Sequence, residues 1–299
     1  MKNSIRNIAS IFKSAFIEWN SKDPFRESAV IAYYSIFSLP GLLVVIITLA
    51  GYVFGREAVN DHIAAQIAST MGQETAEQIQ QMVLKASESK KTIWATLLGA
   101  LTILVGATGV FSQFQKSLNI IWEVKADPGK SGIWKLIRVR LFSFGLVVAI
   151  AFILIVSLVV STTLAALGDW LVGHFSEGFV VILQVLNFIS SLLILSFLFA
   201  LMFKFFPDAK IAWKQVWIGS LITAILFEIG KFGLSFYFGK ANPGTGYGAA
   251  GSIILILLWV SYSSMIVFYG AEFTRAYTNR STGKAQPTDI ARADPKRKA

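Results

Sequence analysis

Cysteine, histidine and charge are all scarce in this chain. The sequence has no cysteine, only two histidines in 299 residues, and 15% charged residues. Without cysteine, disulfides, thiol nucleophiles and cysteine metal sites are excluded. Soluble domains carry about 25% charged residues, so the deficit argues against a soluble protein. Hydrophobic residues make up 55% of the chain, and they gather in long blocks with the charges between them. A bilayer is the solvent that suits such blocks.

Six of these blocks are long enough to cross a bilayer, which takes about 20 apolar residues in a helix. They are Ser28–Phe54, Ile93–Ile121, Leu141–Leu167, Phe179–Phe205, Val216–Phe238 and Tyr247–Ala276. Because lipid offers no hydrogen-bond partners, each block must bond its own backbone as a helix. The sequence therefore predicts an all-α polytopic membrane bundle with six transmembrane helices.

The positive charge between the blocks alternates. Lysine and arginine gather before the first block, between the second and third, between the fourth and fifth, and after the last. The intervening loops are poorer in them, and the loop between the third and fourth blocks has Asp169 and Glu177 but no Lys or Arg. Loops rich in Lys and Arg stay in the cytoplasm. Both termini are therefore predicted to be cytoplasmic.

A single membrane domain, residues 1–276, is expected to account for most of the chain. Its first 22 residues carry apolar side chains at helical spacing between basic ones, which is typical of an amphipathic helix on the membrane surface. Residues 55–92 are predicted to form an outer helical hairpin with a break near Met71-Gly72-Gln73-Glu74. The basic tail, residues 277–299, is polar enough to be predicted disordered.

Ionisable residues inside a span are costly and are candidates for function. Glu228 and Lys231 lie in the fifth span, and their i,i+3 spacing places them on one face of the helix. Two interpretations stay open. The pair locks the helix into the bundle, or it forms a polar spot that lines a substrate path or proton relay.

The first span contains Pro40, followed by Gly41, at a depth close to that of Glu228. Proline removes a helix hydrogen bond and crowds the preceding turn, so a kink or a broken helix is expected. Tyr33, Tyr34 and Ser38 add polar groups just inside it. Transporters build binding sites at such breaks, although an ordinary proline kink is the simpler interpretation.

The second and fourth spans carry further polar residues, which either line a wet cavity or bond neighbouring helices. The candidates are Gln113, Lys116 and Asn119 in the second span and Gln184 and Asn187 in the fourth. Near the inner end of the last span, Glu272 and Arg275 lie three apart and are predicted to form a surface ion pair. We expect no catalytic residues, metal site or cofactor.

Six short segments resemble the YihY/BrkB family of bacterial inner-membrane proteins. They are Ala32–Pro40, Gly109–Phe111, Leu118–Trp122, Gly246–Ser252, Leu258–Tyr262 and Gly270–Phe273. The resemblance covers most of the chain and implies an inner-membrane protein. Members have been labelled ribonuclease BN, virulence or serum-resistance factors, and transporters. Some have been linked to lipids or lipopolysaccharide precursors.

Transport is the function that these observations favour. RNA hydrolysis needs a metal cluster or an acid–base set in reach of the cytoplasm. The predicted cytoplasmic loops have only scattered acids, and His62 and His174 fall on the other side. We therefore expect no enzyme and no nucleic-acid partner, but a transporter or flippase-like protein for an amphipathic or lipid-linked substrate. A non-catalytic scaffold for envelope assembly is the alternative. Membrane lipids are the expected partners, and homo-oligomerisation stays open.

Overall fold

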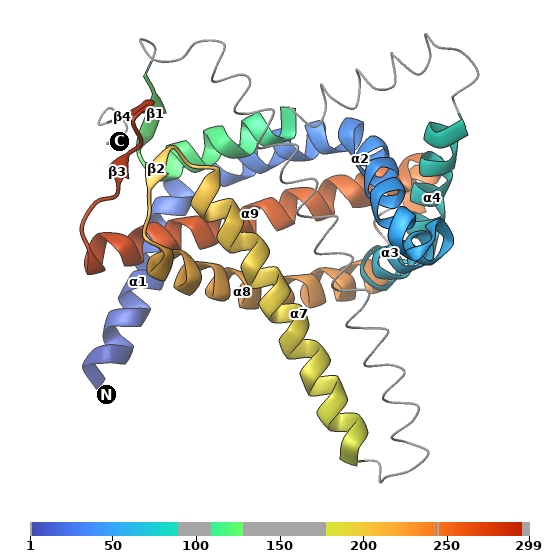
Figure 1. The fold of residues 1–299 in the computed structure, drawn as a ribbon, viewed down its shortest axis with the longest axis horizontal. Coiled ribbons are helices and arrows are strands. Elements are labelled where there is room, and N and C mark those ends of the chain that lie inside the picture. Colours follow the sequence, from blue (N-terminus) through green and yellow to red (C-terminus); the bar gives the residue numbers. More distant parts are fainter. Residues whose placement is uncertain (1, 89–108, 128–177, 242, 244, 295–299) are drawn as a thin grey trace.

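A computed structural model describes residues 2–88, 109–127, 178–241, 243 and 245–294, and this part of the chain is mostly helical (Figure 1). The long helices are α1 (Lys2–Ser21), α2 (Pro24–Phe54), α3 (Arg56–Met71), α4 (Gln73–Glu88), α7 (Gly178–Phe205), α8 (Trp213–Ala241) and α9 (Gly251–Ser281). Residues 109–121 form a further helical segment. The short elements are η1 (Thr245–Ala250) and the strands β1 (Val124–Ala126), β2 (Ala209–Lys210), β3 (Gln286–Pro287) and β4 (Ala291–Ala293).

Three described helices are long and apolar enough to cross a membrane. They are α8, α9 and residues Val185–Phe205 of α7, and α2 makes a fourth if its two arms count as one span. The described residues thus support three or four of the six predicted spans. The third predicted span, Leu141–Leu167, lies outside them.

The α2 helix changes direction part-way along its length. Its arms Pro24–Leu39 and Leu42–Thr48 meet at 53°. Pro40 falls between these arms in the sequence, and a proline has no amide hydrogen to donate within a helix. The bend therefore falls where the sequence predicts one.

The α9 helix lies at the centre of the described bundle. It packs against α8, α2 and α1, and α8 packs in turn against α7. In Figure 1 the Gly178 end of α7 projects away from the other helices. In agreement with this, Val185, Leu186, Phe188 and Ile189 are 45–57% exposed. These positions point in too many directions for a helix that packs through one face only.

The contact between α8 and α9 is built from two glycine–threonine pairs. A methyl group on Gly219 of α8 would overlap the side chain of Thr274 on α9. Reciprocally, a methyl group on Gly270 of α9 would overlap Thr223 on α8. Each threonine hydroxyl donates to the carbonyl of the glycine four residues earlier, both at 2.7 Å. Small residues let helix backbones approach closely, so these four residues set the distance between the two helices.

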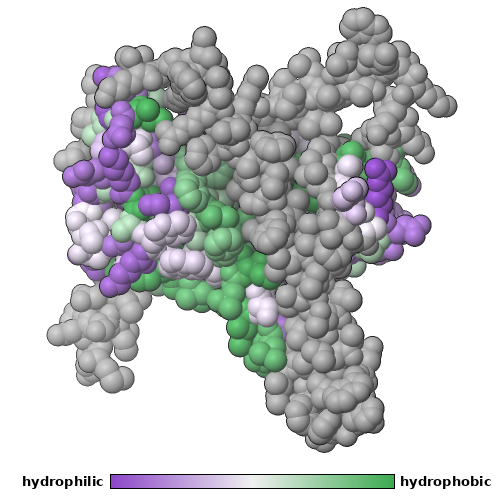
Figure 2. All heavy atoms as spheres, in the orientation of Figure 1, coloured by the Kyte–Doolittle hydropathy of each residue, from purple (hydrophilic) through white to green (hydrophobic). Residues whose placement is uncertain are grey.

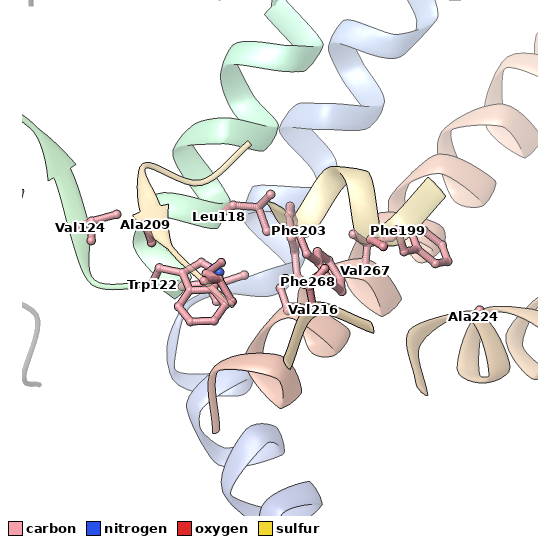
Figure 3. Packing of buried hydrophobic residues seen from close by; sticks show 14 of the residues in the cluster. Leu118, Trp122, Val124, Phe199, Phe203, Ala209, Val216, Ala224, Val267 and Phe268 are labelled. Carbon is pink, nitrogen blue, oxygen red and sulfur yellow. The ribbon is translucent and has the colours of Figure 1, made fainter. Parts of the chain in front are cut away.

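The largest apolar core among the described residues lies near the end of the bundle where the strands are (Figure 3). It joins residues 109–121 to α7, α8 and α9 through Leu118, Trp122, Phe203, Val216 and Phe268, all 4% exposed or less. Burial of one such side chain contributes roughly 1.5–3 kcal/mol. These contacts orient the polar side chains of residues 109–121 that are described below.

The four strands form two small antiparallel ladders at one end of the bundle. β1 pairs with β4, with Ala126 opposite Ala291, and β2 pairs with β3, with Lys210 opposite Gln286. We call this region the ladder end. The start of α2, the end of residues 109–121, the α7–α8 connection and the end of α9 all meet there.

The ordered tail corrects one prediction. The sequence predicts a disordered segment from residue 277, but α9 continues to Ser281, and β3 and β4 follow it. We call residues 282–294 the return segment. They are polar, yet they bond to loop backbone that would otherwise be left unpaired, and such pairing is not visible in composition.

The α3 and α4 helices lie at the opposite end, which we call the hairpin end. Gly72 separates them with a φ of 91°, a left-handed value that suits glycine. Val59, Ile79 and Val83 from this pair pack with Leu43 of α2 and Ile256 of α9. The two helices fall within residues 55–92, where a helical hairpin is predicted, and they cover this end of α2 and α9.

His62 on α3 should make stability depend on pH. Its Nε2 is enclosed and has no partner among the described residues, and burial lowers the pKa of His62 below 6.5. The unfolded chain therefore takes up this proton at higher pH than the folded one, so the free energy of unfolding falls as pH drops below about 6.5. We expect Tm to fall between pH 7 and pH 5, and to fall less in His62→Leu. Equal falls in both proteins would contradict this.

Hydrophobic and hydrophilic residues are separated along the long axis of the molecule. Figure 2 shows hydrophilic residues gathered over the ladder end on the left and over α4 on the right, with a hydrophobic band between them. A protein that crosses a bilayer needs an apolar belt between two polar ends. The visible face therefore has the pattern of a membrane protein.

The α1 helix packs against the bundle through one face. Ile11 and Ala15 are buried with Phe273 of α9, while Phe16 and Ile17 are 55% and 56% exposed. An interfacial amphipathic helix is predicted for residues 1–22. In the structure one apolar face of α1 packs on α9, and Phe16 and Ile17 lie outside that contact.

Candidate functional site

Five charged side chains from four parts of the chain meet at the ladder end, and we call them the charge cluster. They are Glu18, Lys22, Glu123, Glu272 and Arg275. Glu272 is 1% exposed and pairs with both Lys22 and Arg275, the latter at 3.1 Å. Arg275 also contacts Glu123, and lies 3.4 Å from Glu18. Buried charges persist only when they are paired and hydrogen-bonded, and here each one is.

Backbone strain accompanies the cluster. Glu123 has a φ of 54° and adjoins the end of residues 109–121, and Asp23 has a φ of 51° just before α2. Left-handed backbone costs a non-glycine residue roughly 1–2 kcal/mol. At Glu123 the carboxylate contacts Arg275 and lies 3.5 Å from Lys284. These contacts offset the strain and hold the turn that leads into β1.

Lys22 is a cation that contacts several elements. Its Nζ donates to the carbonyl of Ile121 at 3.2 Å and to Glu272. Burial lowers the pKa of the Lys22 ammonium, and the charge of Glu272 opposes that shift. Lys22 thus connects the α1–α2 junction to residues 109–121 and to α9.

Two further buried carboxylates are held by residues 109–121. Glu27 of α2 accepts hydrogen bonds from Gln113 at 2.8 Å and Ser117 at 2.7 Å. Asp208, in the α7–α8 connection, accepts from Asn119 at 2.9 Å and from Gln115 at 3.4 Å. The two pairs of donors have i,i+4 spacing, so each pair forms one face of the helix. One short helix therefore ties α2 on one side and the α7–α8 connection on the other.

A small cavity lies between Glu27 and Glu272. Lys22, Ser117 and Phe268 also line it. Its volume is about 10 Å³, which is room for one water molecule at most. Among the described residues, this cavity is therefore too small to hold a substrate.

The other charged site lies halfway along α8. Lys231 Nζ is 2.6 Å from Glu228 Oε2, and their side chains are 39% and 19% exposed. Glu228 follows Trp213 by fifteen residues, which is about 22 Å along the helix. Beside the pair, Ile229 and Phe232 are 65% and 78% exposed. An ion pair thus lies on a partly open, apolar helix surface.

Comparison with known proteins identifies the family. A family model described as "Virulence factor BrkB" matches residues 15–295, nearly the whole chain. The chain belongs to the BrkB family.

Relatives of this BrkB-family protein are named "UPF0761 membrane protein". One from Teredinibacter turnerae is 28% identical over 271 residues, which cover 90% of this chain and 60% of the relative. One from Saccharophagus degradans is 25% identical over 282 residues, covering 91% and 60%. One from Pseudoalteromonas atlantica is 26% identical over 272 residues, covering 89% and 85%. The chain thus spans about 60% of the length of the first two.

No solved structure matches it. The family and the apolar helices make it an integral membrane protein.

The polar residues predicted to form one path are spread over the BrkB-family bundle. Tyr33 is 59% exposed and packs edge-on against Tyr34, with ring centroids 5.7 Å apart. Tyr34 in turn fills the space over Gly109. Ser38 is buried and donates to the carbonyl of Ser35 at 3.3 Å.

The remaining predicted residues fall into three groups. Gln113 and Asn119 bond the buried carboxylates, Lys116 and Asn187 are exposed, and the side chains of Pro40 and Gln184 lie outside the described part. Glu272 and Arg275 form an ion pair, but it is buried rather than at the surface as predicted. The cause is that Lys22 and Glu123 cover it from two other segments.

Sequence reasoning missed Lys22, Glu27, Glu123 and Asp208 as members of the BrkB-family site. In the sequence they stand out only as charged residues of the predicted cytoplasmic loops. One pattern was available: Glu18 and Lys22 have i,i+4 spacing, as Glu272 and Arg275 have i,i+3 spacing, at the same predicted membrane face. Their convergence needs the packing of α1 on α9, which no local pattern encodes.

Proposed function

We propose that this BrkB-family protein moves an amphipathic or lipid-linked substrate across the bacterial inner membrane as a flippase-like transporter. The ladder end faces the cytoplasm in this proposal, with both termini there. The Lys- and Arg-rich junctions before α2, after residues 109–121, between α7 and α8, and after α9 meet at that end, which supports the orientation.

The open ion pair on α8 carries the proposal. A charge in the middle of a span is costly against lipid alone. Glu228 and Lys231 are paired, but Lys231 is still 39% exposed, with the apolar side chains of Ile229 and Phe232 beside it. Such a surface suits a substrate whose charged headgroup meets the pair while its chains stay on apolar side chains. Lys231 can bind a phosphate, and Glu228 can bind an amine.

The splayed α7 helix supports a lateral route for such a substrate. The α7 helix exposes Val185 and Leu186, and the second half of α8 exposes Phe236 and Tyr237. A substrate that keeps its chains in lipid needs no wide aqueous cavity. Its headgroup still has to leave at the ladder end, where the cavity between Glu27 and Glu272 is too small to hold it.

The test is a lipid-movement assay with the purified full chain. Liposomes would contain phosphatidylethanolamine and phosphatidylglycerol with a headgroup-labelled fluorescent phosphatidylethanolamine, and dithionite would bleach only the outer leaflet. We expect the protein to speed movement between leaflets. Glu228→Gln and Lys231→Gln should each slow it by about tenfold, which corresponds to about 1.4 kcal/mol in the barrier.

The matched control is Lys214→Gln, because Lys214 is an exposed lysine in the first turn of the same helix. It should move lipid at the unaltered rate. The charge-swapped Glu228→Lys/Lys231→Glu protein should regain part of the lost rate, since it keeps a pair at this depth. Undiminished lipid movement in a folded Glu228→Gln protein would remove the pair from the mechanism.

A scaffold for envelope assembly is the second candidate. It is favoured by the charge cluster, whose members bond to one another. The cavity beside Lys22 and Glu272 has a volume of only about 10 Å³, too little for a substrate. A scaffold should show no acceleration of lipid movement in the same assay, even with the unaltered chain. That result would sink the transporter and leave the scaffold.

A further inference from the structure

The return segment is bonded to two different loops at once. Through β4 it pairs with β1, which follows residues 109–121, and through β3 it pairs with β2 in the α7–α8 connection. It is also the direct continuation of α9. Figure 1 shows it as the red chain along the ladder end, beside β1 and β2. One segment therefore links three parts of the bundle.

Backbone hydrogen bonds extend both ladders. Asp127 N donates to Ile290 O at 3.0 Å, and Asp294 N donates to Glu123 O at 2.8 Å. Beside β2, Thr288 N donates to Asp208 O at 2.9 Å. Glu123 and Asp208 are the same residues whose carboxylates bind Arg275 and Asn119. The return segment thus bonds to the backbone of both buried polar sites.

Two ion pairs on the outer side complete the attachment. Lys125 pairs with Asp294 and Lys210 pairs with Asp289, each at 2.8 Å. Their side chains are 32–92% exposed, and exposed pairs contribute only about 0–1 kcal/mol each. Two-stranded ladders of two or three residues are also marginal by themselves. The attachment is therefore weak enough to be reversible.

We propose that the return segment is a strap that holds the ladder end shut, and that it detaches each time a substrate passes. The inference rests on the transport function proposed above. Opening this end requires residues 109–121 and the α7–α8 connection to move apart from α9, and the strap bonds to both loops. Its release removes Thr288 from Asp208 and Lys284 from Glu123, so both polar sites lose a partner at once.

Ala126 and Ala291 provide a direct test, because the chain has no native cysteine. They face each other in the β1–β4 ladder. In an antiparallel ladder, hydrogen-bonded and non-hydrogen-bonded residue pairs alternate. Asp127 and Ile290, the next pair along, are hydrogen-bonded, so Ala126 and Ala291 form a non-hydrogen-bonded pair. Such pairs bring Cα atoms to about 4.5 Å, which falls within the disulfide range of about 4.4–6.8 Å. A cysteine pair there should lock the strap.

The experiment compares Ala126→Cys/Ala291→Cys with Ala291→Cys alone in the liposome assay, oxidised and then reduced. We expect oxidation to slow lipid movement at least about tenfold only in the double variant, and reductant to restore it. Mass spectrometry would confirm the bond. In the opposite direction, Lys125→Glu should speed movement, and Lys125→Glu/Asp294→Lys should return it to the unaltered rate.

Each contrary result has a distinct meaning. If the locked protein moves lipid as fast as the reduced one, the strap is wrong and the transport function stands. If the unaltered chain moves no lipid, the transport function is wrong. If no disulfide forms in the folded protein under oxidation, the β1–β4 pairing itself is wrong, and the strap with it.

Discussion

Replacing Glu272 by glutamine should destabilise the protein by about 3–5 kcal/mol, the usual cost of removing one partner of a buried ion pair. Glu272 is 1% exposed and lies between Lys22 and Arg275. Without its charge, Lys22 and Arg275 lose the buried carboxylate that they share. The free energy of unfolding, measured by denaturant titration in detergent, should fall accordingly.

The double variant Glu272→Gln/Lys22→Met distinguishes pairing from packing. Its cost should be smaller than the sum of the two single costs, because the second change removes a charge that the first left unpaired. The control is Glu77→Gln, at an exposed carboxylate on α4 whose partner is Gln73 at 3.1 Å. Surface changes of this kind stay within about 0.5 kcal/mol. Equal costs for Glu272→Gln and Glu77→Gln would show that the charge cluster adds no stability.

Replacing Gly270 by alanine should cost about 1–3 kcal/mol, the usual range for overpacking a tight contact. The new methyl group would overlap the side chain of Thr223, so α8 and α9 would have to separate. The α8 helix carries the Glu228–Lys231 pair, and α9 carries Glu272 and Arg275. Lipid movement should therefore fall together with the free energy of unfolding.

Gly233 of α8 supplies the matched control, since a methyl group there would meet nothing within 4 Å. Gly233→Ala should be neutral or stabilising by up to about 1 kcal/mol, because alanine is the better helix former. Combining Gly270→Ala with Thr223→Gly should recover stability by removing the overlapping side chain. If Gly270→Ala is as harmless as Gly233→Ala, the close approach of α8 and α9 is not what stabilises this interface.

Several features could be predicted from the sequence because they depend on local chemistry. The apolar blocks around α7, α8 and α9 were found from their length, since a bilayer demands about 20 such residues in a row. The bend of α2 was found from Pro40, which cannot complete a helix ladder. Membership in the BrkB family followed from short motifs and is shown by the match over residues 15–295.

Partner choice among polar groups could not be predicted in the same way. Gln113 and Asn119 were assigned to one substrate path, yet they bond two different carboxylates on opposite sides of residues 109–121. The basic tail was predicted disordered, because composition does not reveal that loops elsewhere offer it backbone partners. The α8–α9 contact was missed as well, although the spacing of Gly219 and Thr223, and of Gly270 and Thr274, could have indicated it.

By itself, then, the sequence determined that this is a helical membrane protein, roughly where its described spans lie, and where α2 bends. Each of these depends on residues close together in the chain and on the solvent around them. Only the tertiary structure decided that Lys22, Glu123 and Glu272 meet, and that the return segment pairs with β1 and β2. Those outcomes depend on how α1, α9 and residues 109–121 pack, and packing joins residues that are far apart in sequence.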